Sequence, residues 1–567
     1  MKSQRKIMAG LSSLVFRFGV CIGIASFCIP TQAADWPNWR GPNYNGISTE
    51  KGWDPGKIKA GVKPLWRASI GTGFSAVSVS NGLVYAMGNT GNKEKDVSKQ
   101  ADIIYCFDAE TGEEIWNYPY PQQLNPKNYE GGTLASPTVV GGKVFTISKD
   151  GKAFCLDAKT GKKIWYRNLL KDLGIKRTTW GVSGSPLIID NMVIYNVGTK
   201  GVALDKNNGN LIWENGKGPG GYATAVPFMI AQQQCIALFG RNSIMGLVAS
   251  SGKELWRFPW PTKHDVNAAD PIIADDTVFI SSGYGTGCTL LKFQETNKSE
   301  LWRNKNMRNK MNGSVLWKGY VYGVDEGGEL RCLDFKTGEL LWAQGGFGMG
   351  SLMIADGKLI VMAEKGNLVI AEAIPDGYKV ISEARILSPR CWSVPVLANG
   401  RMYVRNAYGD LVCLDVSNNT QAVATRNNWA QWRGPSRDGK STEKGLLKKW
   451  PEQGPKLLWS VEGLGTGFST VSIADGLIYT TGMKDGKGIL FAFDLQGNPK
   501  WEEPYGPEWA KGHPGTRCTP TVDQGCVYVI SGMGAVACFD ARTGEEKWIV
   551  DPFSKFAGKY PMWGIAE

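Results

Sequence analysis

Short apolar runs separated by turn residues repeat along the chain, and residues 134–166 show one copy clearly. Four runs rich in β-branched and aromatic residues occur there, separated by Gly141-Gly142, Asp150-Gly151 and Thr160-Gly161. Runs of this length between such turns predict four antiparallel strands. After residue 33, no segment keeps apolar residues at helical spacing for three turns. The pattern therefore predicts an all-β chain made of four-stranded units.

A tryptophan closes most of these units. The frame Asp-Ala-Lys-Thr-Gly-Lys-Lys-Ile-Trp at residues 157–165 recurs with a drifting period of about 40–50 residues, which is typical of repeat architectures. Four-stranded units of this length predict propeller blades. We expect the indole to fill the space between adjacent blades, and the aspartate to accept hydrogen bonds from the turn amides. The repeat tryptophans are Trp66, Trp116, Trp165, Trp213, Trp256, Trp302, Trp342, Trp459, Trp501 and Trp548.

Counting the units predicts an eight-bladed propeller, although the units around Ile370 and Asp415 lack the tryptophan. Trp66 lies upstream of the first unit and has no strands of its own, so we expect it on the outer strand that completes the last blade. This would close the ring by joining both ends of the array. A ring of seven blades is the alternative count. The inner strands are expected to open near Phe74, Leu134, Val182, Ala223, Ala268, Gly313, Gly350 and Ser393.

A leader segment occurs twice. Asp35-Trp-Pro-Asn-Trp-Arg-Gly-Pro is matched by Asn428-Trp-Ala-Gln-Trp-Arg-Gly-Pro, and Gly71-Thr-Gly-Phe-Ser by Gly465-Thr-Gly-Phe-Ser. A second propeller is predicted to begin near residue 428, after a polar linker at residues 416–427, and to supply about two blades. Two blades alone would leave unpaired strand edges, so we expect a fragment of a longer double-propeller protein. The alternative is that these blades close against something else.

The first 33 residues have the character of a signal peptide. They open with basic residues, continue with the apolar stretch Phe18–Ile29 and end in Thr31-Gln-Ala33, after which cleavage is expected. The apolar stretch is too short to span a bilayer, and nothing else approaches about 18 unbroken apolar residues. Neither Cys21 nor Cys28 follows a small residue, which argues against a lipid anchor. The predicted organisation is a signal peptide at residues 1–33, a first propeller at 34–427 and an incomplete second propeller at 428–567.

The charge and the cysteines add little specific chemistry. The net charge is +12, and no block of lysine or arginine occurs, so a solvated surface explains it and no nucleic-acid partner is expected. One repeat position holds either cysteine or, as in Ala203 and Ala492, alanine, which indicates a buried small-residue site with free thiols. Cys518 and Cys526 are the one pair for which a disulfide is considered. The cysteines at the repeat position are Cys106, Cys155, Cys332, Cys413 and Cys538.

Catalytic motifs are absent from the sequence. The two histidines, His264 and His513, exclude histidine-rich zinc sites, and no haem attachment, phosphate loop or nucleophile elbow occurs. Gly283-Tyr-Gly-Thr-Gly lies between predicted strands without a following helix, so a propeller turn is the preferred interpretation. His264 and Asp265 suggest an acid–base pair, but a polar residue at a blade entrance is the interpretation that we favour. No catalytic residue and no metal site are predicted.

The repeat Gly-x-Val-Tyr/Phe, followed by Cys/Ala-Leu/Phe-Asp-Ala-x-Thr-Gly-x-x-x-Trp, resembles the PQQ-type propeller repeat. Quinoprotein alcohol dehydrogenases and the outer-membrane assembly factor BamB share this repeat, and the likeness covers about residues 60–425 and 455–567. The stretch Asp265-Val-Asn-Ala-Ala-Asp-Pro is also similar to the entry of a BamB blade. The doubled leader is similar to that of secreted bacterial PQQ-repeat proteins called BamB-like.

The resemblance implies a propeller and leaves its function open. A BamB-like protein would be a non-enzymatic scaffold in the periplasm or cell envelope of a bacterium, binding a protein or peptide without a cofactor. The alternative is a PQQ-dependent alcohol dehydrogenase with PQQ and Ca²⁺, but the adjacent cysteine pair of those enzymes is absent here and their Ca²⁺ ligands map onto no motif. A second alternative is polysaccharide binding through Trp36, Trp39, Trp429 and Trp432. We expect these indoles to hold the leader segments onto the propeller instead.

Ligands of propellers bind where the inner strands begin, and the residues ahead of those strands form the candidate site. Two tryptophans, two cations and an acid–amide cluster there would suit a flat anionic ligand such as PQQ. Contact with water or with a loop of a partner is the interpretation that we favour. The candidates are Trp180, Tyr222, His264, Asp265, Asn267, Lys310, Asn312, Arg390 and Trp392.

Overall fold

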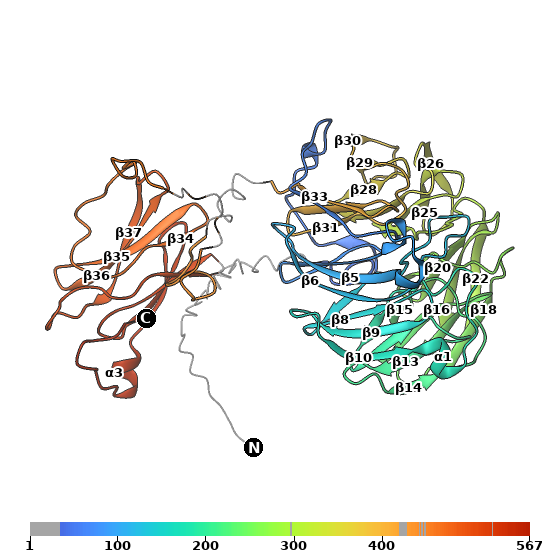
Figure 1. The fold of residues 1–567 in the computed structure, drawn as a ribbon, viewed down its shortest axis with the longest axis horizontal. Coiled ribbons are helices and arrows are strands. Elements are labelled where there is room, and N and C mark those ends of the chain that lie inside the picture. The colour runs from blue at the N-terminus through green and yellow to red at the C-terminus, as the bar shows by residue number, and fades with distance from the viewer. Residues whose placement is uncertain are drawn as a thin grey trace, which may run out of the picture. The chain divides into compact units, whose positions relative to one another are not determined.

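The structure, a computed structural model, describes residues 35–294, 297–418, 428–441, 443, 446, 449–523 and 525–566. The predicted signal peptide and residues 419–427 of the predicted linker lie outside this part of the chain. Antiparallel sheets dominate (Figure 1), which confirms the all-β prediction. Sheets occur in a first array (residues 35–418) and a second array (residues 428–566), and each array is described by itself. The helices are η1 (Pro55–Lys57), η2 (Thr90–Asn92), η3 (Val97–Lys99), α1 (Leu169–Leu173) and α3 (Pro552–Phe556).

Within its described residues, the first array contains eight sheets, where the sequence predicts eight blades. Seven of them have four antiparallel strands, and the seventh in chain order has a fifth strand, β1 (Ile47–Ser48), which pairs in parallel. The first sheet consists of β3 (Ser78–Ser80), β4 (Leu83–Asn89), β5 (Ala101–Asp108) and β6 (Glu114–Pro121), and the second of β7 (Thr138–Val140), β8 (Lys143–Ile147), β9 (Lys152–Asp157) and β10 (Lys163–Asn168). The third consists of β11 (Leu187–Ile189), β12 (Met192–Tyr195), β13 (Val202–Asp205) and β14 (Leu211–Glu214), and the fourth of β15 (Val226–Ile230), β16 (Gln233–Phe239), β17 (Ser243–Val248) and β18 (Glu254–Pro259). The fifth sheet consists of β19 (Ile272–Ala274), β20 (Thr277–Ser282), β21 (Gly287–Gln294) and β22 (Asn297–Asn304). The sixth consists of β23 (Val315–Trp317), β24 (Tyr320–Val324), β25 (Glu329–Asp334) and β26 (Leu340–Gly345). The seventh contains β27 (Ser351–Ala355), β28 (Lys358–Met362), β29 (Asn367–Glu372) and β30 (Val380–Arg385).

The eighth sheet joins the two ends of the array. Its strands are β31 (Val396–Ala398), β32 (Arg401–Arg405), β33 (Asp410–Asp415) and β2 (Trp66–Ser69). Strand β2 runs antiparallel to β33, with Trp66 opposite Cys413 and Ser69 opposite Asp410. Because β2 precedes the first sheet in sequence and completes the last one, the array is closed by strand pairing. The prediction for Trp66 is confirmed.

The repeat tryptophans connect neighbouring sheets, as the sequence predicts. Except for Trp459, which lies outside the strands, each lies on the outer strand of one sheet. In most units the indole N–H donates to a carbonyl just after the aspartate of the next unit. Trp256 is an exception, because its Nε1 finds no acceptor among the described residues and its ring stacks on Phe293 with centroids 5.4 Å apart. In the first array the donor–acceptor distances are 2.9–3.2 Å for Trp66–Ala109, Trp116–Ala158, Trp165–Lys206, Trp213–Ala249, Trp302–Phe335 and Trp342–Ile374.

The Asp-x-x-Thr-Gly turn forms the seat for the indole of the preceding sheet. Asp157 Oδ1 accepts the N–H of Thr160 at 2.8 Å and that of Lys159 at 3.1 Å, as predicted for the turn. Gly161 has φ of +68°, and a Cβ atom added to it would lie 2.7 Å from the Trp116 ring. The glycine is therefore required both for its backbone conformation and for the close approach of the indole.

The cysteine position of the repeat lies directly opposite the tryptophan. Cys106 pairs with Trp116 and Cys155 with Trp165 across the two outer strands. The five repeat cysteines are free and buried, which confirms that prediction. A small residue is needed because the indole covers it: at Gly246, opposite Trp256, an added Cβ would overlap the ring. Outside this set, no disulfide joins the candidate pair Cys518 and Cys526.

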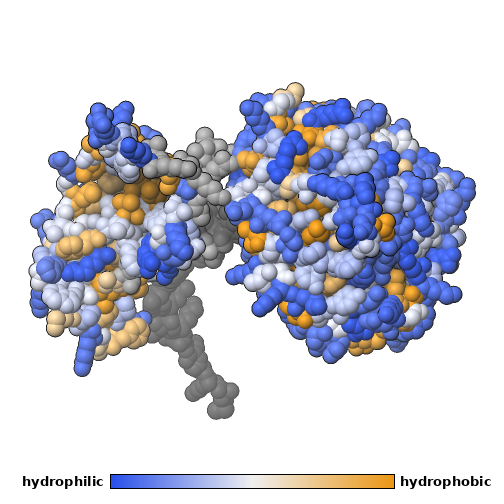
Figure 2. All heavy atoms as spheres, viewed as in Figure 1, coloured by the Kyte–Doolittle hydropathy of each residue, from blue (hydrophilic) through white to orange (hydrophobic). Residues whose placement is uncertain are grey.

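The second array contains two sheets in its described residues. Trp501 on the first of them donates to Ala541 of the second at 3.3 Å, as in the first array. Apolar side chains are widely exposed here (Figure 2), including Leu458 at 80% and Trp548 at 42%. Its strands are β34 (Ser472–Ala474), β35 (Leu477–Lys484), β36 (Lys487–Asp494) and β37 (Pro499–Pro507); β38 (Thr521–Asp523), β39 (Cys526–Ile530), β40 (Val536–Asp540) and β41 (Glu546–Val550).

Helices in the described part of the chain are short, and none has the length and apolar character needed to cross a membrane.

Gly161→Ala tests the indole seat, with Gly141→Ala as its matched control. Both glycines have positive φ, but nothing lies within 4 Å of an added Cβ at Gly141. We expect Gly141→Ala to lower the free energy of unfolding by about 1–2 kcal/mol through backbone strain alone. Gly161→Ala should cost about 1–3 kcal/mol more, because Trp116 must move. Denaturant unfolding followed by tryptophan fluorescence measures the difference, and equal losses would contradict the seat.

Candidate functional site

The leader, residues 35–50, lies across the inner strands of the first array. Trp36 forms an isolated bridge with Val79 on β3, and the carbonyl of Pro37 accepts the N–H of Val139 on β7. Farther along, β1 (Ile47–Ser48) pairs in parallel with β27. The leader thus contacts inner strands on different sides of the ring, so it lies across the axis. Trp36 is only 1% exposed, which agrees with the expectation that this indole holds the leader in place.

A buried charge pair holds the middle of the leader. The guanidinium of Arg40 donates to the carbonyl of Ser314 at 2.6 Å, and its Nε lies 4.0 Å from Asp270 Oδ2. The same carboxylate accepts the indole N–H of Trp39 at 2.5 Å and, through Oδ1, the N–H of Thr224 at 2.7 Å. Burial raises the pKa of Asp270, while the charge of Arg40 acts in the opposite direction. These contacts bind the leader to the beginnings of three inner strands.

An arc of aromatic side chains lies where five inner strands begin. Phe74 stacks on Trp392 with ring centroids 5.0 Å apart, and Tyr129 lies 5.6 Å from Phe74. Trp180 follows at 6.0 Å from Tyr129, and its backbone N–H donates to the hydroxyl of Tyr222 at 3.4 Å. These residues precede β31, β3, β7, β11 and β15, which belong to consecutive sheets around the ring. We call Phe74, Tyr129, Trp180, Tyr222 and Trp392 the aromatic arc.

Paired charges accompany the arc. Arg390 Nη1 lies 3.1 Å from Glu130 Oε2, and its guanidinium carbon lies 5.0 Å from the centre of the Trp392 ring. Tyr408 donates its hydroxyl to the other oxygen of Glu130 at 3.2 Å, and the charge of Glu130 raises the pKa of that phenol. Glu364 Oε1 accepts the indole N–H of Trp392 at 2.9 Å. The polar groups beside the arc are therefore held in fixed positions by one another.

A second group forms around Tyr284, on the turn that follows β20. The ring of His264 meets Tyr284 edge-on at 4.9 Å, and Lys310 Nζ lies 5.1 Å from the centre of the same ring. Glu326 Oε1 accepts the N–H of Gly285 at 2.9 Å. Burial raises the pKa of Tyr284, as it does for two phenols of the arc, so these groups stay neutral. The side chains of this group form a surface that a ligand or partner can contact. None of them is a nucleophile held by a neighbouring base.

The remaining candidates have different surroundings. Asp265 forms an ion pair with Arg241. Asn267 is fully buried, and its Nδ2 donates to the carbonyls of Gly240, Arg241 and Trp260 at 3.0–3.2 Å. Such a residue stabilises the chain and has no group left for a ligand.

The structure thus brings Trp180, Tyr222, Arg390 and Trp392 together in or beside the arc. Asn312 joins them by donating to the carbonyl of Trp392 at 2.7 Å. Lys310 and His264 share Tyr284 instead, while Asp265 and Asn267 belong to neither group. The sequence analysis missed several neighbours of these residues. Two of them, Tyr129 and Glu130, lie before Thr133, just ahead of an inner strand, so the same rule of position would have found them. The missed residues are Phe74, Tyr129, Glu130, Tyr284, Glu326, Glu364 and Tyr408.

Comparison with known sequences gives consistent matches. A family model described as outer membrane protein assembly factor BamB matches residues 99–344 and 379–561, more than half of the chain. Outer membrane protein assembly factor BamB of Nitrosomonas eutropha is 27% identical over 256 residues, which cover 42% of this chain and 51% of the relative. That of Escherichia coli K12 is 29% identical over 104 residues, or 18% of this chain and 26% of the relative. The chain spans about half or less of the length of these curated relatives.

Solved structures give weaker likenesses. BamB from Moraxella catarrhalis superposes with a TM-score of 0.47 and 16% identity, covering 62% of this chain and 99% of the other. A europium-containing methanol dehydrogenase has a TM-score of 0.34 and 14% identity, covering 92% of this chain and 86% of the other. At these scores, neither structure supports a functional conclusion.

Asn267→Ala and Asn312→Ala separate a buried structural amide from one beside the arc. Asn267→Ala removes the donor from the buried carbonyls of Gly240 and Trp260 and from the part-buried carbonyl of Arg241. We expect it to lower the free energy of unfolding by about 3 kcal/mol. Asn312→Ala removes a single bond from a half-buried side chain and should cost about 1 kcal/mol. Urea unfolding of both variants measures this. An undisturbed stability of Asn267→Ala would return that residue to the candidate site.

Proposed function

The chain belongs to the PQQ-type β-propeller family whose model is described as outer membrane protein assembly factor BamB, and from this premise we propose that it is an exported, non-enzymatic scaffold that recognises an extended peptide segment of an envelope protein. The aromatic arc is the observation that carries this proposal. Tryptophan, tyrosine and arginine are the residues that dominate binding energy at protein interfaces. The arc offers these types side by side, already packed on one another.

Preorganisation supports binding at the arc. The Arg390–Glu130 ion pair and the Trp392–Glu364 hydrogen bond fix the side chains before a partner arrives. A partner then loses less free energy to the ordering of side chains than it would at a mobile surface. Because the leader lies across the ring axis, a segment approaches the arc along the face on which the inner strands begin.

The cell envelope is the proposed location. The basic and apolar character of the first 33 residues indicates export. The curated relatives are named as outer membrane protein assembly factors, so an envelope protein is the class of partner that we propose.

The dehydrogenase alternative has less support from the residues present. No group of three or more His, Cys, Asp or Glu side chains that could hold a cation occurs in the described ranges. Among the arc's indoles, Trp392 already stacks on Phe74 and carries the Arg390 guanidinium. These surroundings do not fit PQQ with Ca²⁺, and we derive no reaction through that cofactor. Polysaccharide binding through the tryptophans of the first leader is likewise not proposed, because Trp36 is buried and Trp39 is bonded to Asp270.

Peptide binding at the arc can be measured directly. A library of extended segments from bacterial envelope proteins would be screened by fluorescence anisotropy against the protein and its Trp392→Ala and Tyr129→Ala variants. We expect each variant to weaken binding about tenfold or more, the effect of losing a central aromatic contact. Tyr166→Ala is the matched control, since Tyr166 is exposed and lies away from the arc. An absence of any saturable peptide binding, or an equal loss in the control, contradicts the proposal.

Cofactor binding gives an independent check. We expect the visible spectrum of PQQ to stay unchanged when the protein and Ca²⁺ are added, and no dye reduction with alcohols. The Trp392 ring already contacts Phe74 and Arg390, and the carboxylates of Glu130 and Glu364 are already bonded to Arg390 and Trp392. A saturable spectral change that Trp392→Ala abolishes would support the dehydrogenase alternative instead.

A further inference from the structure

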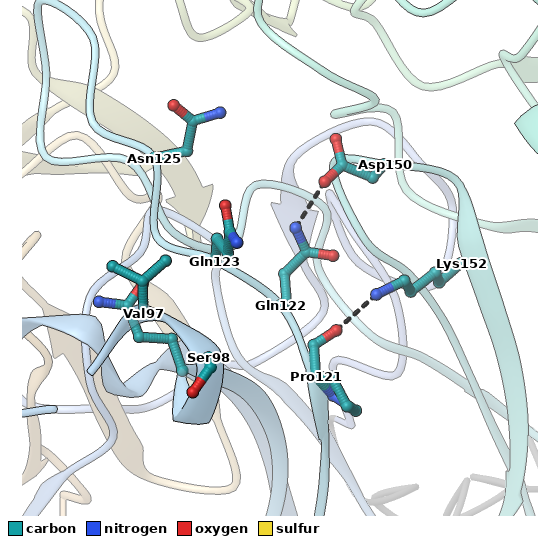
Figure 3. A pocket seen from close by; sticks show the side chains of 9 residues that line it. Val97, Ser98, Pro121, Gln122, Gln123, Asn125, Asp150 and Lys152 are labelled. Atoms are coloured by element: carbon teal, nitrogen blue, oxygen red, sulfur yellow. Dashed lines mark hydrogen bonds between the residues drawn. The ribbon is translucent and has the colours of Figure 1, made fainter. Parts of the chain in front are cut away.

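A polar cavity of ≈ 340 Å³ opens between the first and second sheets of the first array (Figure 3). It is lined by the η3 turn, by the segment after β6 and by the turn between β8 and β9. Its volume lies within the range of small-molecule pockets, about 300–1,000 Å³. The polar residues that line it include Ser98, Gln122, Gln123, Asn125, Asp150 and Lys152.

Gln122 is the most informative residue of this cavity. Only 6% of it is exposed, and its Nε2 donates to Asp150 Oδ2 at 2.5 Å. Its Oε1 is buried and accepts no hydrogen bond from any described residue. A buried acceptor without a donor costs about 1–3 kcal/mol. A hydroxyl or N–H group that reached this oxygen from the cavity would remove this cost.

The charged residues that line the cavity already have hydrogen-bond partners. Asp150 accepts from Arg177 Nε at 2.6 Å as well as from Gln122. Burial raises the pKa of Asp150, but these bonds outweigh it and the pKa lies below its ordinary value. Lys152 donates its amine to the carbonyl of Pro121 at 2.5 Å. Both charged side chains are therefore already engaged in hydrogen bonds, and the amides remain as the groups that can recognise a ligand.

We propose that this cavity is a binding site for a neutral polyhydroxylated ligand, a saccharide of one or two rings. A side-chain amide carries both donors and an acceptor, as a sugar hydroxyl both donates and accepts. Three amides at Gln122, Gln123 and Asn125 around a cavity without net charge match that chemistry. The volume near the lower end of the pocket range sets the size to one or two rings.

This site is separate from the aromatic arc but lies on the same connecting segment. The segment that joins β6 to β7 supplies Gln122 and Asn125 to the cavity, and Tyr129 and Glu130 to the arc. The two proposals are nevertheless independent, because they use different side chains and different ligand chemistry.

Ligand-observed NMR and calorimetry on the whole protein test the site. The probes are glucose, N-acetylglucosamine, maltose and chitobiose, with glutamate, lysine and inorganic phosphate as charged counterparts. We expect saturable binding of at least one saccharide and none of the charged probes. Gln122→Leu should weaken this binding about tenfold, equivalent to about 1.4 kcal/mol.

Gln123→Ala keeps the inference testable if Gln122→Leu disturbs folding, because Gln123 is exposed and should lower affinity without changing thermal stability. Gln344→Ala, an exposed amide on β26 away from the cavity, is the matched control and should bind as the unaltered protein does. Absence of saccharide binding at millimolar concentration overturns the proposal, leaving a bound water as the donor to Gln122. Binding of a charged probe alone overturns it too, as does saccharide binding that neither cavity variant weakens.

Discussion

The structure depends on one contact that is repeated from sheet to sheet: an indole on the outer strand of one blade seated on the aspartate–glycine turn of the next. The indole contributes a large buried apolar area and donates its N–H to a carbonyl of the next unit, as Trp116 does to Ala158. The turn contributes a glycine that leaves room for the ring, and the facing strand contributes a small residue such as Cys106. Three positions of the repeat thus act together. Strand β2, which carries Trp66 and completes the last sheet, makes the same indole contact with the first sheet.

A second constraint acts along the axis. The leader introduces a tryptophan and an arginine into the ring, and Asp270 compensates the buried charge of Arg40. A single buried charge without such a partner would be strongly unfavourable. The leader of the second array keeps the equivalent backbone contact of its first tryptophan, between Trp429 and Ile473, while its second tryptophan, Trp432, is exposed. The two leaders therefore share the backbone contact of their first tryptophan. The buried contact of the second tryptophan occurs only in the first array, where the surrounding blades supply Asp270.

The loops of the first array form two neighbouring candidate binding places that differ in their side chains. Aromatic faces and paired charges gather at the beginnings of the inner strands, whereas amides gather in the cavity between the first two sheets. Both are built by segments that connect rigid strands, which is where recognition residues are expected on a stable scaffold. The connection from β6 to β7 serves both places, so contacts made at one can affect the backbone that presents the other.

The sequence alone determined the repeat, the strand-rich class, the turn chemistry of Asp157 and Gly161, the free buried cysteines and the closing role of Trp66. These follow from local periodicity and from residue types that recur at one position, and they need no knowledge of distant contacts. The site was predicted less completely. Trp180, Tyr222, Arg390 and Trp392 were named from their place ahead of inner strands, and the structure groups them, whereas nothing in the sequence tells that the amide of Asn267 donates to three backbone carbonyls. Glu130 and Glu364 were missed because their partners, Arg390 and Trp392, lie on other blades. Only the closed ring brings such residues together, since it fixes which strand beginnings lie next to one another, even where they are 260 residues apart as Glu130 and Arg390 are.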